Sequence, residues 1–439
     1  MAMVVKNNMS AINTLNILNK NTSALSKSLQ KVSSGMKINS AADDASGYAI
    51  SERMRVQIRS LDQDKANTQN GNSMMKVAEG AVSSTVEILK TLKEKVVNAA
   101  NDTNTDADRE TIQKELDQSI DQINDNANVT FNGQYLVDGS HNSKGTATTT
   151  VMTNQNLSTA TAVASVMTDL KSRDGDALNI QKTDTVTISY VKMGKTYTTS
   201  FTVSNCTLSA VVNAATSAAG GTATDIKMGT NVNSVIGTDK SGNTVYTASG
   251  ESAVSVQAGV SGVNGQIAGF TISITDNTGK VNKSANAALD AFDESIRAQN
   301  ASEDNAIVLQ IGTKASQSIK AGLTDMRAVA LGLQGTDGTT LNVSNQTKAN
   351  AAINVLDNAV QKALDQQTTI GAVESRLDYT ASNLTTASEN VTSSESTIRD
   401  ADMAKEMTEY TKNNVLMQAA QSMLAQANQN SSNVLSLLK

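Results

Sequence analysis

The sequence predicts a mainly α-helical protein in which long helices from both chain ends form an antiparallel bundle or coiled coil with an inserted β-rich domain. Three observations support this fold class. The chain of 439 residues contains no proline, the residue that breaks helix interiors. Apolar residues near both ends recur at alternating steps of three and four, which places them on one helical stripe. Between the ends lies a zone rich in Thr, Ser, Gly and Asn, in which apolar residues recur at every second position.

The two terminal stripes each need a partner helix, so we expect the chain ends to pair with one another. Leaving such a stripe at a chain end is typical of a protein that assembles, because an isolated helix cannot bury it. We therefore expect fraying ends in the monomer and burial of the stripes against neighbouring copies. The predicted assembly seam comprises Leu15, Leu18, Leu25, Leu29, Val32, Leu416, Ala420, Met423, Ala427, Val434 and Leu437.

The interior of the chain divides into further helices and a β-rich segment. Helical stripes are predicted over 78–99, 112–123, 353–363 and 373–391. Period-two alternation of β-branched and aromatic residues over 186–190, 197–203 and 270–274 indicates half-buried antiparallel strands. Because the helical pattern returns after residue 290, we interpret the β-rich segment as an insertion between two halves of one bundle.

Composition excludes several classes of function. The net charge is −6 and the isoelectric point is near 5.1, so we expect no general attraction to nucleic acid or to anionic membranes. No apolar stretch is long enough to span a bilayer, and the N-terminal segment lacks the apolar run of a secretory signal. The lone Cys206 rules out an intramolecular disulfide. By composition alone the protein would be called cytoplasmic.

We expect no enzyme activity, cofactor or metal site. The single histidine, His141, lies in a polar stretch and cannot form a His-based triad or a His-rich metal site. The tripeptide at 194–196 resembles the end of a phosphate-binding loop, but the required earlier glycine is Ser189, so a hairpin turn is predicted instead. The Asp-rich run 102–108 resembles half of a calcium loop, but Ala107 and Gln113 occupy its glycine and glutamate positions. We interpret that run as a connector that caps the next helix.

Several ordered motifs resemble bacterial flagellin. SSGMKINSAADDASGYAISERM (33–54) is similar to its N-terminal signature, and FNGQYLVDG follows at 131–139. On the return, LQIGTKASQSIKAGLTDMRAVALGL (309–333), IGAVESRLDY (370–379), IRDADMAKEM (398–407) and LAQANQNSSNVLSLLK (424–439) appear in the flagellin order. The resemblance covers residues 1–140 and 300–439, whereas the middle zone matches no pattern we can name.

The resemblance implies a division of the chain and a function. It implies an N-terminal inner-core helix (1–42), two halves of an outer bundle (43–140 and 301–397) and a C-terminal inner-core helix (398–439). The variable surface domain would occupy 141–300, with its end uncertain between 285 and 305. The implied function is a structural subunit that self-assembles through its terminal helices into the flagellar filament used for motility. A flagellar hook–filament junction protein and a secreted coiled-coil effector are the alternatives.

The resemblance also implies partners and a location. The expected partners are further copies of the chain, flagellar junction and cap proteins, and an export chaperone that masks the C-terminal helix. The expected location is extracellular, in the filament, after export without a cleavable signal peptide. Residues 42–47 would form the joint between the terminal helices and the outer bundle, with Ser40, Asp43 and Asp44 capping the next helix.

Recognition by the vertebrate Toll-like receptor 5 is a further implication of the resemblance. Flagellins that bind this receptor strongly have an arginine and, four residues later, a leucine on an outer-bundle helix. Thr91 and Lys95 hold those positions here, next to Lys90, while the matching acidic residue Glu115 is retained. We therefore expect weakened receptor binding, because threonine cannot replace the planar donor fork of arginine.

Overall fold

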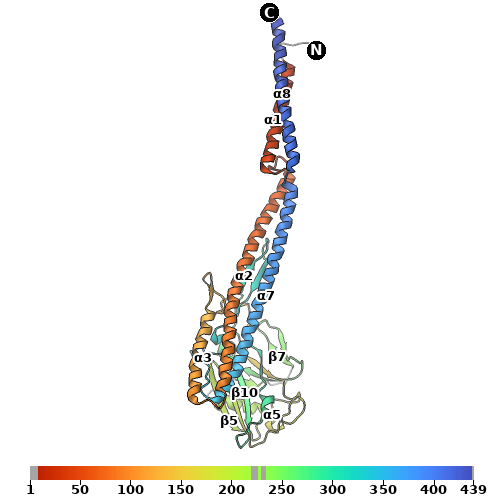
Figure 1. Cartoon of the computed structure of the whole chain (residues 1–439). Helices are drawn as coiled ribbons and strands as arrows, with labels where there is room; N and C mark the ends of the chain where they lie inside the picture. Colours follow the sequence, from red (N-terminus) through yellow and green to blue (C-terminus); the bar gives the residue numbers. More distant parts are fainter. Residues whose placement is uncertain (1–7, 219–225, 229–233, 438–439) are drawn as a thin grey trace. The chain divides into compact units, whose positions relative to one another are not determined.

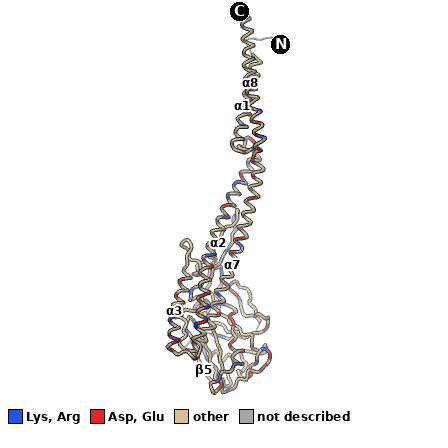
Figure 2. Tube along the Cα trace, in the orientation of Figure 1, with Lys and Arg blue, Asp and Glu red and all other residues tan. Residues whose placement is uncertain are grey.

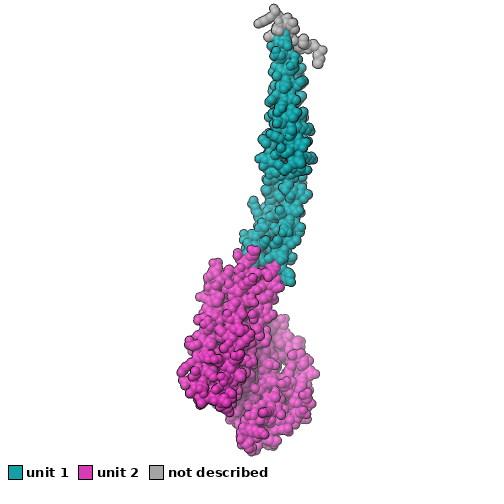
Figure 3. All heavy atoms as spheres, viewed as in Figure 1, with its two compact units in different colours: residues 1–68, 310–317, 379–439 teal, residues 69–309, 318–378 magenta. Residues whose placement is uncertain are grey.

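The computed structural model describes residues 8–218, 226–228 and 234–437, with the backbone alone described for 214–218 and 434–437. The chain forms two compact units, and each is described here by itself. Unit 1 comprises residues 1–68, 310–317 and 379–439, and unit 2 comprises 69–309 and 318–378 (Figure 3). Two of the four boundaries between the units fall inside long helices, α2 (Ala45–Ala99) and α7 (Gln346–Arg399).

Unit 1 contains the two chain ends, α1 (Met9–Ser34) and α8 (Met403–Leu437), side by side along their length (Figure 1). The two helices run antiparallel, because Asn8 near the start of α1 donates to the carbonyl of Ala427 at 3.2 Å. At the other end of α1, Lys31 Nζ lies 3.5 Å from Glu406 Oε1. The predicted antiparallel pairing of the chain ends is confirmed.

The rest of unit 1 includes the first part of α2 beside the last part of α7. Arg55 Nε donates to Glu395 Oε1 at 3.1 Å, and Ser388 Oγ donates to Asp62 Oδ1 at 3.3 Å. The Arg55 side chain therefore belongs to a contact between two antiparallel helices. Both contacts join segments that lie more than three hundred residues apart in the sequence.

In unit 2, the remaining parts of α2 and α7 are joined by α3 (Asp106–Ala127) and α6 (Ala328–Leu331). The predicted stripe on α2 is confirmed, since its members are all buried: Ala78, Val82, Thr85, Leu89, Leu92, Val96 and Ala99. Leu116, Ile120 and Ile123 of α3 are also buried. Helix α3 begins with a capping box, in which Thr105 and Asp108 bond one another's backbone, so the Asp-rich run caps a helix.

The β-rich part of unit 2 contains two main antiparallel sheets. One has the order β10-β4-β5 and the other the order β11-β3-β9-β6. The strands of the first are β4 (Thr185–Lys192), β5 (Lys195–Thr202) and β10 (Ile267–Thr275). Those of the second are β3 (Val151–Asn154), β6 (Ile226–Met228), β9 (Val254–Ala258) and β11 (Asp293–Ile296). The strands predicted around 186–190, 197–203 and 270–274 are therefore confirmed.

Shorter elements complete unit 2. Three two-stranded sheets pair β1 (Thr130–Phe131) with β2 (Gln134–Tyr135), β7 (Val235–Thr238) with β8 (Thr244–Tyr246), and β12 (Ile307–Gln310) with β13 (Ser318–Ala321). The short helices are α4 (Leu208–Ala218) and α5 (Lys283–Leu289), with 3₁₀ turns at Met167–Asp169 and Val263–Gly265. The sheets and α4 and α5 enclose a core that includes Tyr190, Phe270, Ile272, Val212 and Leu289.

Strand β10 lies directly on helix α7. A Cβ added at Gly269 would come within 2.8 Å of Val355 Cγ2, so only glycine fits at this close approach. Asn358 Nδ2 donates to the carbonyl of Ala268 at 2.8 Å, and Asn354 Nδ2 to that of Phe270 at 3.3 Å. The longest described strand of the β-rich segment therefore packs on a helix of the bundle within the same compact unit.

Candidate assembly surface

The contact between α1 and α8 includes positions that alternate at steps of three and four residues, and many of them are polar. On α1 these half-buried or buried positions are Ala11, Thr14, Leu18, Asn21, Leu25, Ser28 and Val32. On α8 they are Glu406, Tyr410, Asn413, Met417, Ala420, Leu424, Ala427 and Ser431. Asn21 Nδ2 donates to the carbonyl of Leu416 at 3.2 Å, and Asn413 Nδ2 to Ser28 Oγ at 3.1 Å. We call these residues the internal seam.

The predicted assembly seam therefore splits into two sets. Five of its members lie in the internal seam, namely Leu18, Leu25, Val32, Ala420 and Ala427. Four others, Leu15, Leu29, Leu416 and Met423, were expected to face the partner helix and instead face solvent, one position away from the internal seam. Several positions of the internal seam are polar, so the spacing of apolar residues alone does not identify which residues face the partner helix. The side chains of Val434 and Leu437 lie outside the described residues.

The solvent-facing set belongs to a larger exposed apolar surface on both helices, which we call the outer stripe. Its exposure is substantial, since Met423 is 62% exposed and Leu29 is 52% exposed. The members are Met9, Ile12, Leu15, Ile17 and Leu29 on α1, and Met403, Met407, Val415, Leu416 and Met423 on α8. At about 100° per residue the members are spread around each helix, so more than one side of the coil exposes apolar side chains.

The end of α8 is also unusually poor in charge. Residues 413–438 contain no Asp, Glu, Lys or Arg, and Figure 2 shows the corresponding end of the coil almost free of charged positions. A solvated helix face normally alternates charges of both signs. This uncharged run is visible in the sequence, although the prediction from the apolar pattern did not use it. It indicates an interaction surface on the same part of α8 as the outer stripe.

The joint after α1 is built around Arg399, the last residue of α7. Its side chain is buried, donates to Glu52 Oε1 at 2.6 Å and lies 5.4 Å from the ring centroid of Tyr48. Its carbonyl accepts from Lys37 N at 2.7 Å, and Ala401 N donates to the carbonyl of Gly35 at 2.9 Å. No local sequence pattern predicts the role of Arg399 in this joint, because its partners lie about 350 residues away.

The capping of α2 differs from our expectation. Asp44 alone caps the helix, since its Oδ1 accepts from the backbone of Ser46 and Gly47, each at 3.0 Å. Asp43 instead accepts from the backbone and hydroxyl of Ser40, which tightens the preceding turn and lowers the Asp43 pKa. Gly47 packs closely at this point, because a Cβ there would lie 2.5 Å from Asp44 Oδ2 and 2.7 Å from Ile38 Cδ1 and would displace the capping carboxylate.

The four candidate receptor residues lie on neighbouring faces of α2 and α3. Lys95 Nζ is 3.0 Å from Glu115 Oε1, so the retained acid is already paired within the chain. Lys90 Nζ is 2.7 Å from Glu87 Oε1, and the Thr91 hydroxyl donates to the Glu87 carbonyl at 3.1 Å. All these side chains are at least partly exposed, so the surface is accessible.

The remaining sequence features have structural roles. Gly194 has φ of +72° at the turn between β4 and β5, which confirms the predicted hairpin. Cys206 is a half-buried free thiol against the β-rich core, and His141 Nδ1 lies 3.2 Å from the Asn305 carbonyl in a loop. Among the described residues, no group of acidic, His and Cys side chains could hold a metal ion. None of the described helices is both long and apolar enough to cross a bilayer.

Comparison with known proteins identifies the family. Residues 5–142 match the bacterial flagellin N-terminal helical region, and residues 353–438 match the bacterial flagellin C-terminal helical region. A flagellin of Clostridium tyrobutyricum is 34% identical over 97% of this chain and 99% of its own length. A flagellin of Bacillus subtilis is 30% identical over the full length of both chains. The structure of FlgL from Xanthomonas campestris aligns with 79% of this chain and 99% of its own at 13% identity and a TM-score of 0.31. On the two matched regions and the full-length identity, the chain belongs to the bacterial flagellin family.

Proposed function

We propose that this flagellin polymerises by packing the outer stripe of one copy against neighbouring copies. As a flagellin, the chain is a structural subunit of the flagellar filament, and neither a junction protein nor a secreted effector is favoured. The observation that supports the assembly route is an exposed apolar surface on a coil whose end is free of charge.

Burial of the outer stripe supplies the free energy of association. Removing apolar surface from water is worth about 25 cal/mol per Å². The internal seam is poor in large apolar residues, so the two helices alone bury little of their apolar surface. Contacts that do not close into a ring produce an open helical polymer, which is the form of a filament.

We infer the remaining partners from the same surface and from the resemblance. An apolar, uncharged α8 is the natural segment for an export chaperone to mask before assembly. Flagellar junction and cap proteins would contact the ends of the polymer. The resemblance also supports an extracellular location in the filament.

We also propose that binding to Toll-like receptor 5 is weak. The ion pair between Lys95 and Glu115 places a charge where strong binders have leucine and neutralises the acid that is retained. The pair itself is exposed and contributes little, so the charge of Lys95 at an apolar contact position is the main reason for the weakening. A dose–response comparison in receptor-expressing cells tests this proposal. Thr91→Arg/Lys95→Leu should increase potency, and an unchanged potency would contradict it.

The assembly proposal is tested by matched charges placed on and off the outer stripe. Leu416→Asp puts a carboxylate on the stripe, whereas Gln421→Asp puts one on an exposed position of the same helix outside it. Seeded polymerisation, followed by sedimentation and electron microscopy, should fail for Leu416→Asp and proceed for Gln421→Asp. Circular dichroism of both monomers should be unchanged. Filaments from Leu416→Asp at the wild-type yield would refute this use of the surface.

A further inference from the structure

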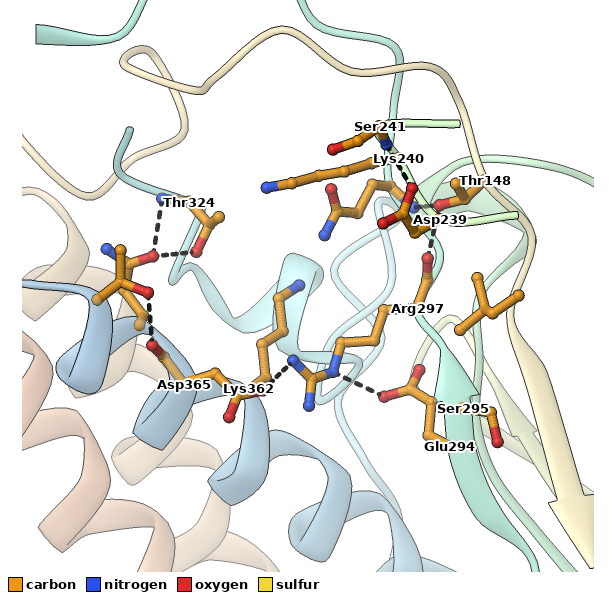
Figure 4. Close-up of a pocket in the computed structure, with 14 residues that line it drawn as sticks. Thr148, Asp239, Lys240, Ser241, Glu294, Ser295, Arg297, Thr324, Lys362 and Asp365 are labelled. Atoms are coloured by element: carbon orange, nitrogen blue, oxygen red, sulfur yellow. Dashed lines mark hydrogen bonds and ion pairs between the residues drawn. The ribbon is translucent and has the colours of Figure 1, made fainter. Parts of the chain in front are cut away.

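The β-rich part of unit 2 meets helix α7 at a hollow that assembly does not explain. The hollow has a volume of about 410 Å³ and is lined by β11, by the turn after β7 and by α7. Its lining is polar, with hydroxyl groups from Thr148, Ser241, Ser295 and Thr324 beside charged residues. Figure 4 shows the side chains that surround it.

Two lysines direct their ammonium groups into this hollow (Figure 4). Lys362 of α7 is buried, and its Nζ donates to the carbonyl of Ala330 at 2.7 Å. An ammonium has three donors, so two remain for other partners. Lys240 is half-buried, and within the described residues no carboxylate pairs with it. Burial lowers the pKa of Lys362 to about 8, the charges of Glu294 and Asp325 oppose this shift, and the charges of Arg297 and Lys240 add to it.

Two of the three acidic residues of the hollow have partners for both carboxylate oxygens or for the oxygen in their own turn, and the third is only partly paired. Asp365 accepts from Arg297 Nη1 at 2.6 Å and from Gln361 at 2.9 Å. Asp239 accepts from the backbone of Ser241 and of Asn243 in its own turn. Glu294 Oε2 accepts from Arg297 Nε at 3.2 Å, whereas its buried Oε1 has no hydrogen-bond partner among the described residues. Burial raises the Glu294 pKa to about 7, so this carboxyl group is protonated below that pH and can then donate to an anion.

Gln366 provides a second, independent indication of a ligand. It is only 4% exposed, and its Oε1 accepts from Thr324 N at 3.2 Å and from Thr324 Oγ1 at 2.7 Å. Its Nε2 is buried and has no hydrogen-bond partner among the described residues. A buried donor without a partner is unfavourable, so such groups usually have a ligand or an ordered water.

We propose that this hollow binds a small oxyanion, with Lys240 and Lys362 as its charge partners and the surrounding hydroxyl and amide groups as further donors. The lining offers more unsatisfied donors than acceptors, which fits a ligand that carries several oxygens. Inorganic phosphate and short dicarboxylates share this chemistry. The site belongs to unit 2, whereas the outer stripe belongs to unit 1, and the site does not depend on the assembly proposal.

Isothermal titration calorimetry of the monomeric full-length chain tests the site. Phosphate and succinate are titrated separately at constant ionic strength, well below the pKa of about 8 that burial gives Lys362. We expect saturable binding of one anion per chain for at least one of the two. Binding of phosphate alone would indicate a tetrahedral anion, and binding of succinate alone a carboxylate.

Matched variants identify the residues responsible. Lys240→Gln should weaken binding about tenfold or more, because it removes one charge-assisted partner. Lys362→Met keeps the buried stem, removes the ammonium and should have a similar effect. Lys182→Gln, at an exposed position away from the hollow, makes the same charge change as Lys240→Gln and should leave binding unaltered. Absence of saturable binding to the wild type, or equal weakening by Lys182→Gln, would overturn the proposal.

Discussion

The carboxyl group of Glu294 makes the stability of unit 2 depend on pH. The side chain is 6% exposed, and burial raises its pKa from 4.5 to about 7 against the opposing attraction of Arg297 and Lys362. Below about pH 4.5 the group is protonated in both the folded and the unfolded chain. As the pH rises through about 7, folding must bury a charge that the unfolded chain keeps in water. The folded state therefore loses stability across this window.

The size of the loss follows from the pKa change. A shift from 4.5 to about 7 corresponds to about 3 kcal/mol in the free energy of unfolding. Part of this loss has already occurred at about pH 5. The free energy of unfolding of the wild type should therefore be about 2 kcal/mol lower at about pH 8 than at about pH 5. Glu294→Gln cannot ionise but keeps an oxygen that accepts from Arg297. The variant should lack this component and gain stability over the wild type as the pH rises.

Urea unfolding at the two pH values measures the effect. Tyrosine fluorescence is a suitable probe, because Tyr190 is fully buried and stacks on Tyr197 at 5.0 Å within the β-rich core of unit 2. Glu303→Gln, which removes an exposed carboxylate, is the control and should behave as the wild type does at both pH values. The reasoning would be refuted if the stability difference between Glu294→Gln and the wild type were the same at both pH values.

Three further substitutions test other parts of the fold. Gly269→Val should destabilise unit 2 by about 1–3 kcal/mol in urea unfolding, because the new side chain meets Val355 and the Ala351 carbonyl. Arg109→Met should cost about 1–3 kcal/mol in the same assay, since the guanidinium satisfies the carbonyls of Ala99 and Asn101. Asp44→Ala removes the cap of α2 and should cost about 1 kcal/mol, measured as faster hydrogen exchange in the first turn, with Asp43→Ala affecting the preceding turn instead.

Much of the architecture was predictable because apolar residues recur at regular spacing within single helices and strands. The stripe from Ala78 to Ala99 stays in phase with a helix over six turns, and each of its members is buried. The alternation over 186–190 and 270–274 likewise gave two neighbouring strands of one sheet, now seen paired from Thr185 to Lys192 against β10. Local periodicity identifies such elements without knowledge of their partners.

The parts that were not predictable depend on contacts between distant residues. Asn21, Ser28 and Asn413 occupy the internal seam, and an apolar pattern cannot reveal a seam made of amides and hydroxyls. The close approach of Gly269 to α7 depends on a residue about ninety positions away, and so gives no local signal. The hollow draws its two lysines from segments more than a hundred residues apart, and only folding brings them together.

The outer stripe on α8 has a chemical vulnerability, because three of its five members are methionines. Met403, Met407 and Met423 are all more than two-fifths exposed in the single chain. Oxidation converts the thioether to a polar sulfoxide, which no longer favours an apolar contact. A subunit that meets an oxidant before it joins the polymer would lose the surface that joins it, whereas a neighbour packed over the same sulfur atoms would shield them. Oxidative damage should therefore fall on the unassembled pool and spare the subunits already in place.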